Sequence, residues 1–307
     1  MIPRFTPILL SALALLNPLG AFGQNQPDGE SPREQARANF QREIVLGADD
    51  TRRFPDAPDG YKSVRGDIPA GRVESFEYES GVTGTVRAAS VYLPPNYSSE
   101  RAYPVLYLLH GIGGDETEWL RFTQTNVILD NLIADGKAEP MIVVMPNGRA
   151  IPDDRAVGEI FAPDKIEGFA KFERDLLEFL IPAVEKRYSV KSKRESRALA
   201  GLSMGGGQSL NFALSHLDRF AWLGAFSAAP NTKDPAELMP SPEKVSEKLK
   251  LFYLSCGNKD ALINVSQRVQ AYLKSHDIPH IWNVDDFGHD AETWGSNLYH
   301  FAQRLFR

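Results

Sequence analysis

The sequence predicts an α/β fold, in which a mostly parallel, doubly wound sheet follows an antiparallel N-terminal hairpin. Residues 73–80 and 85–93 alternate apolar and polar side chains and are joined by a short link flanked by glycines, a pattern typical of a hairpin. Residues 103–109 and 140–145 are continuous apolar runs, as expected of strands buried on both faces. Stretches with helical spacing separate the later runs, which favours parallel pairing.

After the hairpin, strands and helices alternate along the chain. The expected strands are 103–109, 140–145, 197–201, 222–226, 249–255 and 280–284. The expected helices are 126–134, 169–188, a run from the turn at 201–205 to 216, a short one within 230–246, 263–275 and 291–306. Pro182 should break or kink the second helix. Residues 149–168 lack periodicity and predict a long loop, which is the best place for a substrate-selecting lid.

Three parts of the chain differ in composition. Residues 1–23 have one charge, Arg4, before a short apolar run and end in Ala21-Phe22-Gly23. This pattern predicts a secretory signal peptide, too short to span a membrane, and therefore a secreted or periplasmic protein. Residues 24–70 have few large apolar side chains and one modest helical stretch at 32–46, so they predict a leader or wrapping segment. Residues 71–307 form the expected single domain.

The overall composition excludes several classes of protein. The 307 residues are 42% hydrophobic and 24% charged, as in an ordinary globular protein. The net charge of −6 and the lack of a long basic block argue against a nucleic-acid partner. Cys256 is the single cysteine and lies in an apolar strand pattern, so we expect a buried structural thiol. The scattered histidines and the absence of a cofactor fingerprint predict neither a metal nor a cofactor.

The segment 201–205 reads Gly-Leu-Ser-Met-Gly, a G-x-S-x-G motif between an expected strand and an expected helix. A serine held in a strained turn crowds the residues two positions away on either side, where glycine removes the colliding Cβ atoms. The alternatives are a chance match or a phosphate-binding turn, although the registers of the common phosphate loops are missing. Ser203 is therefore a candidate nucleophile that needs a base, an acid and an oxyanion hole.

Three polar residues directly follow three of the expected parallel strands. Ser203 follows 197–201, Asp260 follows 249–255 and His289 follows 280–284. Functional groups gather at the carboxyl ends of such strands. His289 would take the proton of the serine hydroxyl, and Asp260 would orient the imidazole. The chain order Ser, Asp, His is that of the α/β-hydrolase arrangement.

Other residues compete for the same roles. The remaining histidines are His110, His216, His276, His280 and His300. His110 is expected in another loop, and His216 and His276 are expected at helix ends. His280 begins its strand and so lies at the wrong end of the sheet, and His300 lies inside the last helix. All five are therefore weaker candidates for the base. Asp285 and Asp286 also precede His289, but the simpler interpretation of both is a solvated loop charge.

The glycine-bearing loop 110–114 follows the expected strand 103–109. In the hydrolase arrangement such a loop supplies one oxyanion-hole N–H, and the residue after the nucleophile supplies the other. The backbone N–H groups of Ile112 and Met204 are the candidates. The alternative is a plain glycine turn.

Several stretches resemble one known family. They are Val91-Tyr-Leu-Pro-Pro-Asn-Tyr97, Tyr103-Pro-Val-Leu-Tyr-Leu-Leu-His-Gly111, Asp130-Asn-Leu-Ile133, Val144-Met-Pro-Asn-Gly148 and Ala200-Gly-Leu-Ser-Met-Gly-Gly206. Over about residues 70–307 the chain resembles the esterase D-like α/β-hydrolases, and within them carbohydrate esterase family 1, the feruloyl and acetyl xylan esterases. The resemblance implies hydrolysis of esters on plant cell-wall xylan, with Ser203 as nucleophile, His289 as base and Asp260 as supporting acid.

The resemblance leaves the substrate open. Family members often have an aromatic residue within two positions after the catalytic histidine, whereas here the first is Trp294. Trp119 and Trp294 are candidates for stacking a phenolic ring, and the alternative for each is a place in the core. A siderophore trilactone or general acyl esterase, and a hydrolase-fold binding protein without catalysis, remain competing functions. The sequence does not determine the oligomeric state.

Overall fold

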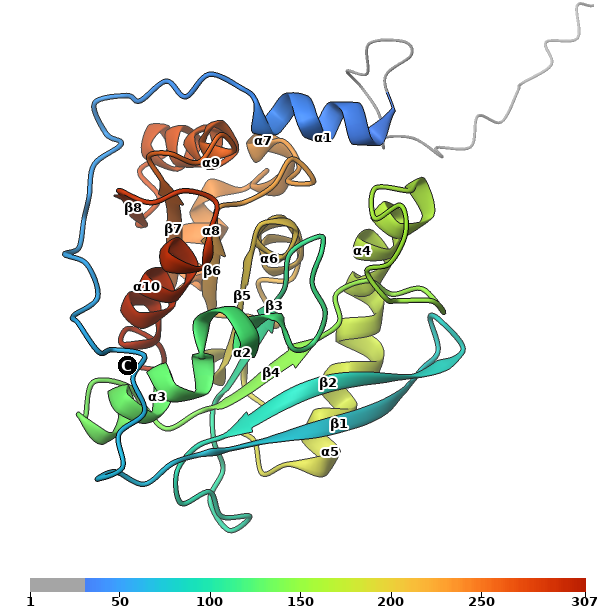
Figure 1. The fold of residues 1–307 in the computed structure, drawn as a ribbon, viewed down its shortest axis with the longest axis vertical. Helices are drawn as coiled ribbons and strands as arrows, with labels where there is room; N and C mark the ends of the chain where they lie inside the picture. The colour runs from blue at the N-terminus through green and yellow to red at the C-terminus, as the bar shows by residue number, and fades with distance from the viewer. Residues whose placement is uncertain (1–30) are drawn as a thin grey trace, which may run out of the picture.

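The computed structural model describes residues 31–307 as one eight-stranded sheet covered by helices on both faces (Figure 1). The expected signal peptide lies outside the described residues. In spatial order the strands are β1 Arg72–Ser80, β2 Thr85–Leu93, β4 Ile142–Pro146, β3 Val105–Leu109, β5 Arg197–Leu202, β6 Trp222–Phe226, β7 Leu251–Gly257 and β8 Ile281–Asp285. β1, β2 and β4 pair antiparallel, and the pairs from β4 to β8 are parallel. The predicted fold class is confirmed.

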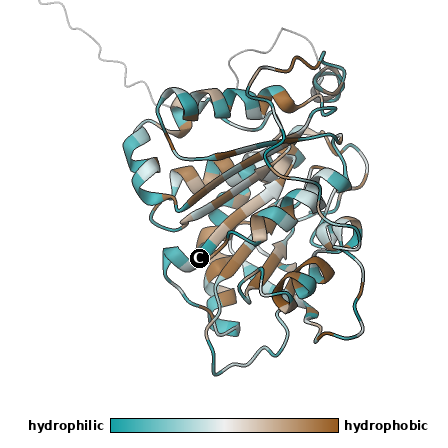
Figure 2. Cartoon of the chain, turned by 90° about the vertical axis from the view of Figure 1, so that its left-hand side faces the viewer, coloured by the Kyte–Doolittle hydropathy of each residue, from teal (hydrophilic) through white to brown (hydrophobic). Residues whose placement is uncertain are grey.

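The parallel strands are buried on both sides. Along β3, Tyr107 and Leu109 face one core, whereas Leu106 and Leu108 face the other, which is the period of two that a strand imposes. The strand begins at Val105, later than predicted, because Pro104 has no N–H for the ladder. Figure 2 shows apolar strands between helices whose outer faces are polar.

The helices form the two outer layers. In chain order they are α1 Pro32–Phe40, α2 Glu118–Thr123, α3 Thr125–Ala134, α4 Pro163–Asp175, α5 Ile181–Arg187, α6 Met204–Ser215, α7 Pro235–Leu238, α8 Pro242–Lys248, α9 Ile263–Ser275 and α10 Ala291–Ala302. One core includes Phe172 of α4, Val184 of α5, Leu210 of α6 and Val269 of α9, and the other includes Leu129 of α3 and Leu298 of α10.

The helix predicted at 169–188 differs from the structure in two ways. It begins earlier, at Pro163, because a proline suits the first turn of a helix. Its break lies at Leu176–Leu180, a five-residue π-helical turn before Pro182. Proline cannot donate to the carbonyl four residues earlier and collides with it, so the preceding turn widens.

The described part of the leader combines α1 with an extended segment along the edge strand β8. A capping box of Ser31 and Glu34 begins α1. The helix predicted at 32–46 ends at Phe40, because Ile44 leaves the helical path to pack against the core. The Val284 N–H then donates to the Thr51 carbonyl at 3.1 Å. The leader thereby covers an edge that would otherwise be open to pairing with another chain.

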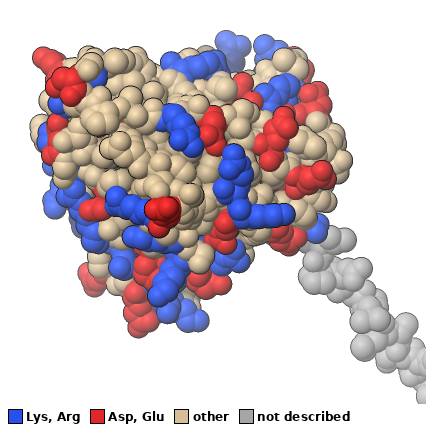
Figure 3. Space-filling view, turned by 90° about the horizontal axis from the view of Figure 1, so that it is seen from below, with Lys and Arg blue, Asp and Glu red and all other residues tan. Residues whose placement is uncertain are grey.

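Two further findings concern the surface. Within residues 31–307, no helix is long and apolar enough to span a lipid bilayer. On the face seen in Figure 3, cationic and anionic side chains are interspersed, so this face has no continuous basic surface.

Candidate active site

Ser203 lies in a sharp turn between β5 and α6. Its backbone has a φ of 52° and a ψ of −119°, a strained conformation for a residue with a side chain. A Cβ atom on Gly201 would lie 2.4 Å from the Gly205 carbonyl oxygen, and one on Gly205 would lie 2.5 Å from the Leu109 carbonyl oxygen. Both glycines are therefore required by packing, for the steric reason expected from the motif.

The three residues singled out in the sequence form a continuous hydrogen-bonded line. The Ser203 Oγ lies 3.0 Å from the His289 Nε2, and the His289 Nδ1 lies 2.8 Å from the Asp260 Oδ2. The side chains come from the loops after β5, β7 and β8, at the carboxyl ends of these strands. This is the geometry in which an imidazole can take a proton from a serine hydroxyl.

The buried Asp260 is held in its charged form. Burial raises the pKa of this carboxyl group, but the hydrogen bond and charge of His289 and the N–H of Leu262 outweigh burial and bring it below its ordinary value. The Cys256 thiol lies 3.4 Å from the Asp260 Oδ2, and burial together with that charge raises the pKa of Cys256. Cys256 is thus a buried thiol, as predicted, and Asp260 is a fixed carboxylate.

The two rival acids have different surroundings. Asp286 is exposed, as expected. Asp285 is only 4% exposed and accepts hydrogen bonds from the Phe287 N–H at 3.2 Å and the Asn297 Nδ2 at 2.6 Å. The expectation of a solvated charge at Asp285 is wrong, because α10 packs against the end of β8. Burial raises the pKa of Asp285 to about 6, and the residue anchors the loop that leads to His289.

We expect Asp285→Asn to remove a pH-dependent loss of stability. The ordinary pKa of this group is 3.8, so the folded protein binds the proton more tightly than the unfolded chain. The resulting stabilisation is fully present below about pH 4 and is lost as the pH rises through about 6. The free energy of unfolding of the parent relative to the variant should fall by about 2 kcal/mol from about pH 4 to about pH 7. Urea unfolding at both pH values measures it, and a difference independent of pH would contradict it.

The two candidate oxyanion N–H groups are free. Within residues 31–307, neither the Ile112 N–H nor the Met204 N–H donates to an acceptor. The Ile112 carbonyl accepts a hydrogen bond from the Arg149 Nη2 at 2.6 Å. The preceding Gly111 N–H donates to the Glu118 Oε2, also at 2.6 Å. The loop is thus held on both sides of Ile112.

Sequence reasoning missed Arg149 and Glu118. Arg149 is fully buried, and its guanidinium group lies over the Phe169 ring at 5.0 Å. The feature of the sequence that could have pointed to Arg149 was its position just after a buried strand. His110 also braces this region, because its Nε2 accepts from the Gly148 N–H at 2.8 Å. Burial lowers the pKa of His110 to about 4, so it is a neutral structural histidine.

The structure assigns the two candidate tryptophans to the interior. Trp119 is 1% exposed, and its indole N–H donates to the Leu109 carbonyl at 2.9 Å. Of the two alternatives left open for Trp119, the structure therefore favours a place in the core, because β3 and β6 enclose the side chain. Trp294 is also buried and packs edge-on against the imidazole of His289, with 5.3 Å between ring centroids. It supports the imidazole, and a direct substrate contact for Trp294 stays a prediction.

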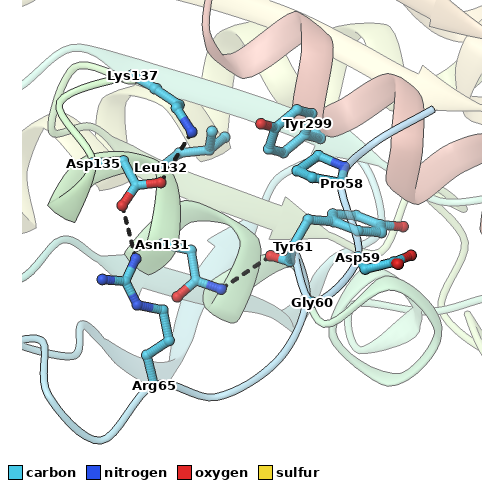
Figure 4. A pocket seen from close by; sticks show the side chains of 10 residues that line it. All are labelled: Pro58, Asp59, Gly60, Tyr61, Arg65, Asn131, Leu132, Asp135, Lys137 and Tyr299. Atoms are coloured by element: carbon cyan, nitrogen blue, oxygen red, sulfur yellow. Dashed lines mark hydrogen bonds and ion pairs between the residues drawn. The ribbon is translucent and has the colours of Figure 1, made fainter. Parts of the chain in front are cut away.

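A separate cavity of about 190 Å³ lies between the leader, α3 and α10 (Figure 4). Both of its cationic side chains, Arg65 and Lys137, pair with Asp135. The Asn131 side chain donates to the Tyr61 carbonyl at 3.0 Å. These contacts hold the leader on α3, and the cavity includes none of the three residues of the hydrogen-bonded line. Over residues 31–307 no group of His, Cys, Asp and Glu side chains could hold a metal ion.

Comparison with known proteins gives the class of this fold and site. Residues 80–300 match the family Esterase, described as "Putative esterase". The chain belongs to this family of ester hydrolases, and the sheet with its helices is the α/β-hydrolase fold.

Its similarity is to feruloyl esterases in particular. The chain is 33% identical over 262 residues to the endo-1,4-beta-xylanase/feruloyl esterase of Xylanibacter ruminicola, covering 83% of this chain and 34% of the relative. The structure of a CE1 ferulic acid esterase from Anaeromyces mucronatus in complex with ferulic acid has a TM-score of 0.73 and 28% identity, covering 82% of this chain and 96% of that one. The chain spans about a third of the length of the first relative. The resemblance to carbohydrate esterase family 1 is confirmed.

Proposed function

We propose that this protein is a secreted serine carboxylesterase that removes feruloyl or acetyl groups from plant cell-wall xylan. The observation that carries the proposal is the Ser203–His289–Asp260 line, with distances of 3.0 and 2.8 Å, in a strained turn at the carboxyl edge of the sheet. The names of the similar proteins support a feruloyl ester as the substrate. Secretion is inferred from the pattern of residues 1–23.

The proposed reaction has two halves. In the first, the His289 Nε2 takes the Ser203 proton while the Oγ attacks the ester carbonyl carbon. His289 then protonates the leaving sugar alkoxide, and an acyl-enzyme remains. In the second half, His289 takes a proton from water, the resulting hydroxide attacks the acyl-enzyme, and the proton returns to the Ser203 Oγ as the free acid leaves.

Two further groups lower the barrier in both halves. The Ile112 and Met204 N–H groups would bind the developing oxyanion, and each such donor contributes about 3 kcal/mol. Asp260 fixes the imidazole tautomer and stabilises the imidazolium that forms.

A substrate panel tests the proposal on the mature full-length protein. We expect release of ferulate from methyl ferulate and feruloylated arabinoxylan, or of acetate from acetylated xylan, each measured by chromatography. The panel includes a siderophore trilactone, because the enterobactin esterase of Shigella flexneri shares the fold at 19% identity. Lack of hydrolysis of any cinnamoyl or acetyl ester would overturn the proposed function.

A further inference from the structure

The helix α1 of the leader contacts the proposed catalytic histidine. Phe40, its last residue, packs edge-on against the His289 ring, with 5.3 Å between centroids and 74° between planes. Near its other end, Arg33 pairs with Glu159 at 3.5 Å, in the loop before α4. Figure 1 shows α1 at the end of the molecule where α4 begins. One wall of the site therefore comes from the leader and not from the hydrolase domain.

A pocket of about 400 Å³ lies between α1 and the loop before α4. It is lined by Arg33, Glu34, Ala36, Arg37, Phe40 and Phe161. Pockets for small molecules commonly have volumes of about 300 to 1,000 Å³. Phe40 is 46% exposed although it contacts His289. The part of its ring that does not contact the imidazole is therefore available to a ligand in this pocket.

The lining has the chemistry of an aromatic-acid site. Phe40 and Phe161 offer two phenyl rings, which prefer edge-to-face or offset contacts with another ring. Arg33 is engaged by Glu159, whereas Arg37 has no carboxylate partner within residues 31–307. A free guanidinium donates to oxygen and also attracts the face of a π-system. A ring with phenolic oxygens matches both features, and an acetyl group matches neither.

The position of the pocket also suits this ligand. Phe40 contacts His289, and His289 is hydrogen-bonded to Ser203 at 3.0 Å. In a hydroxycinnamoyl ester a short propenoyl link separates the ring from the ester carbonyl. The ring can therefore lie against Phe40 while the carbonyl carbon lies at the Ser203 Oγ. Trp119, enclosed in the core, cannot provide this surface.

We propose that the α1 pocket binds the aromatic ring of a hydroxycinnamoyl ester, with Phe40 as a specificity-determining residue that touches the substrate. This inference rests on the proposed function and deepens it. The leader is thus part of the substrate site as well as the cover of β8.

The test compares Phe40→Ala with Leu46→Ala in the full-length protein. Leu46 is a matched control, because it lies in the same leader with 47% exposure and does not line the pocket. For Phe40→Ala we expect kcat/KM on methyl ferulate to fall about tenfold, mainly through a higher KM. Activity on methyl acetate, which has no ring, should fall by a clearly smaller factor than activity on methyl ferulate, because an acetyl group does not reach the ring site. Phe40→Tyr, which keeps an aromatic ring, should be clearly more active on methyl ferulate than Phe40→Ala. Leu46→Ala should behave as the parent.

The outcomes separate this inference from the proposed function. An equal loss on both esters would mean that Phe40 only supports the imidazole, and no loss on either would mean that the ring binds elsewhere. Both results overturn the inference while leaving the esterase intact. A parent protein that hydrolyses acetyl esters but no cinnamoyl ester also overturns it. A parent protein inactive on every ester instead defeats the proposed function, and the inference with it.

Discussion

Replacing Ser203 with alanine should lower kcat/KM on methyl ferulate by about 10⁴-fold or more. The Oγ is the only atom removed, and it is the atom 3.0 Å from the His289 Nε2. Without it no acyl-enzyme forms, and only the binding and oxyanion contributions remain. Steady-state assays with a sensitive product readout measure the loss.

Ser266→Ala is the control for this prediction. Ser266 lies on α9 with a fully buried side chain and does not take part in the hydrogen-bonded line. Its replacement should leave kcat/KM close to that of the parent. If Ser203→Ala retained the parent activity, the nucleophile would have to be another residue.

The second large effect is expected at Asp260. Asp260→Asn should lower kcat by about 10⁴-fold, with a much smaller change in KM. The carboxylate accepts the His289 Nδ1–H, which leaves the Nε2 free to take the serine proton. An amide in its place can hold the imidazole in the opposite tautomer, in which the Nε2 already carries a proton. Separate kcat and KM values show whether chemistry or binding is lost.

Asp286→Asn provides a matched control, because this acid lies three positions before His289 and is exposed. Its side chain accepts a hydrogen bond from the Asn258 Nδ2 at 2.6 Å. We expect nearly parental kinetics. A large loss of activity for Asp286→Asn, together with parental activity for Asp260→Asn, would contradict the assignment of Asp260 as the orienting acid.

Local patterns in the sequence predicted the elements and their order. Alternation identified β1 and β2, and continuous apolar runs identified the parallel strands. These patterns are readable because burial on one or both faces of a strand is a property of neighbouring residues. Element ends were less accurate: the 149–168 loop ends at Pro163, and the predicted 32–46 helix ends at Phe40. Ends depend on packing partners elsewhere in the chain.

The sequence by itself also determined which residues follow the parallel strands, and this was enough to bring Ser203, Asp260 and His289 to one edge of the sheet. Only the tertiary structure decided that Trp119 is enclosed in the core and that Asp285 is buried beneath α10. The tertiary structure likewise placed Phe40 against His289, although the two residues lie almost 250 positions apart in the chain. The physical reason is that strand order follows from short-range pattern, whereas the side chains that meet around a site depend on how distant loops and helices pack.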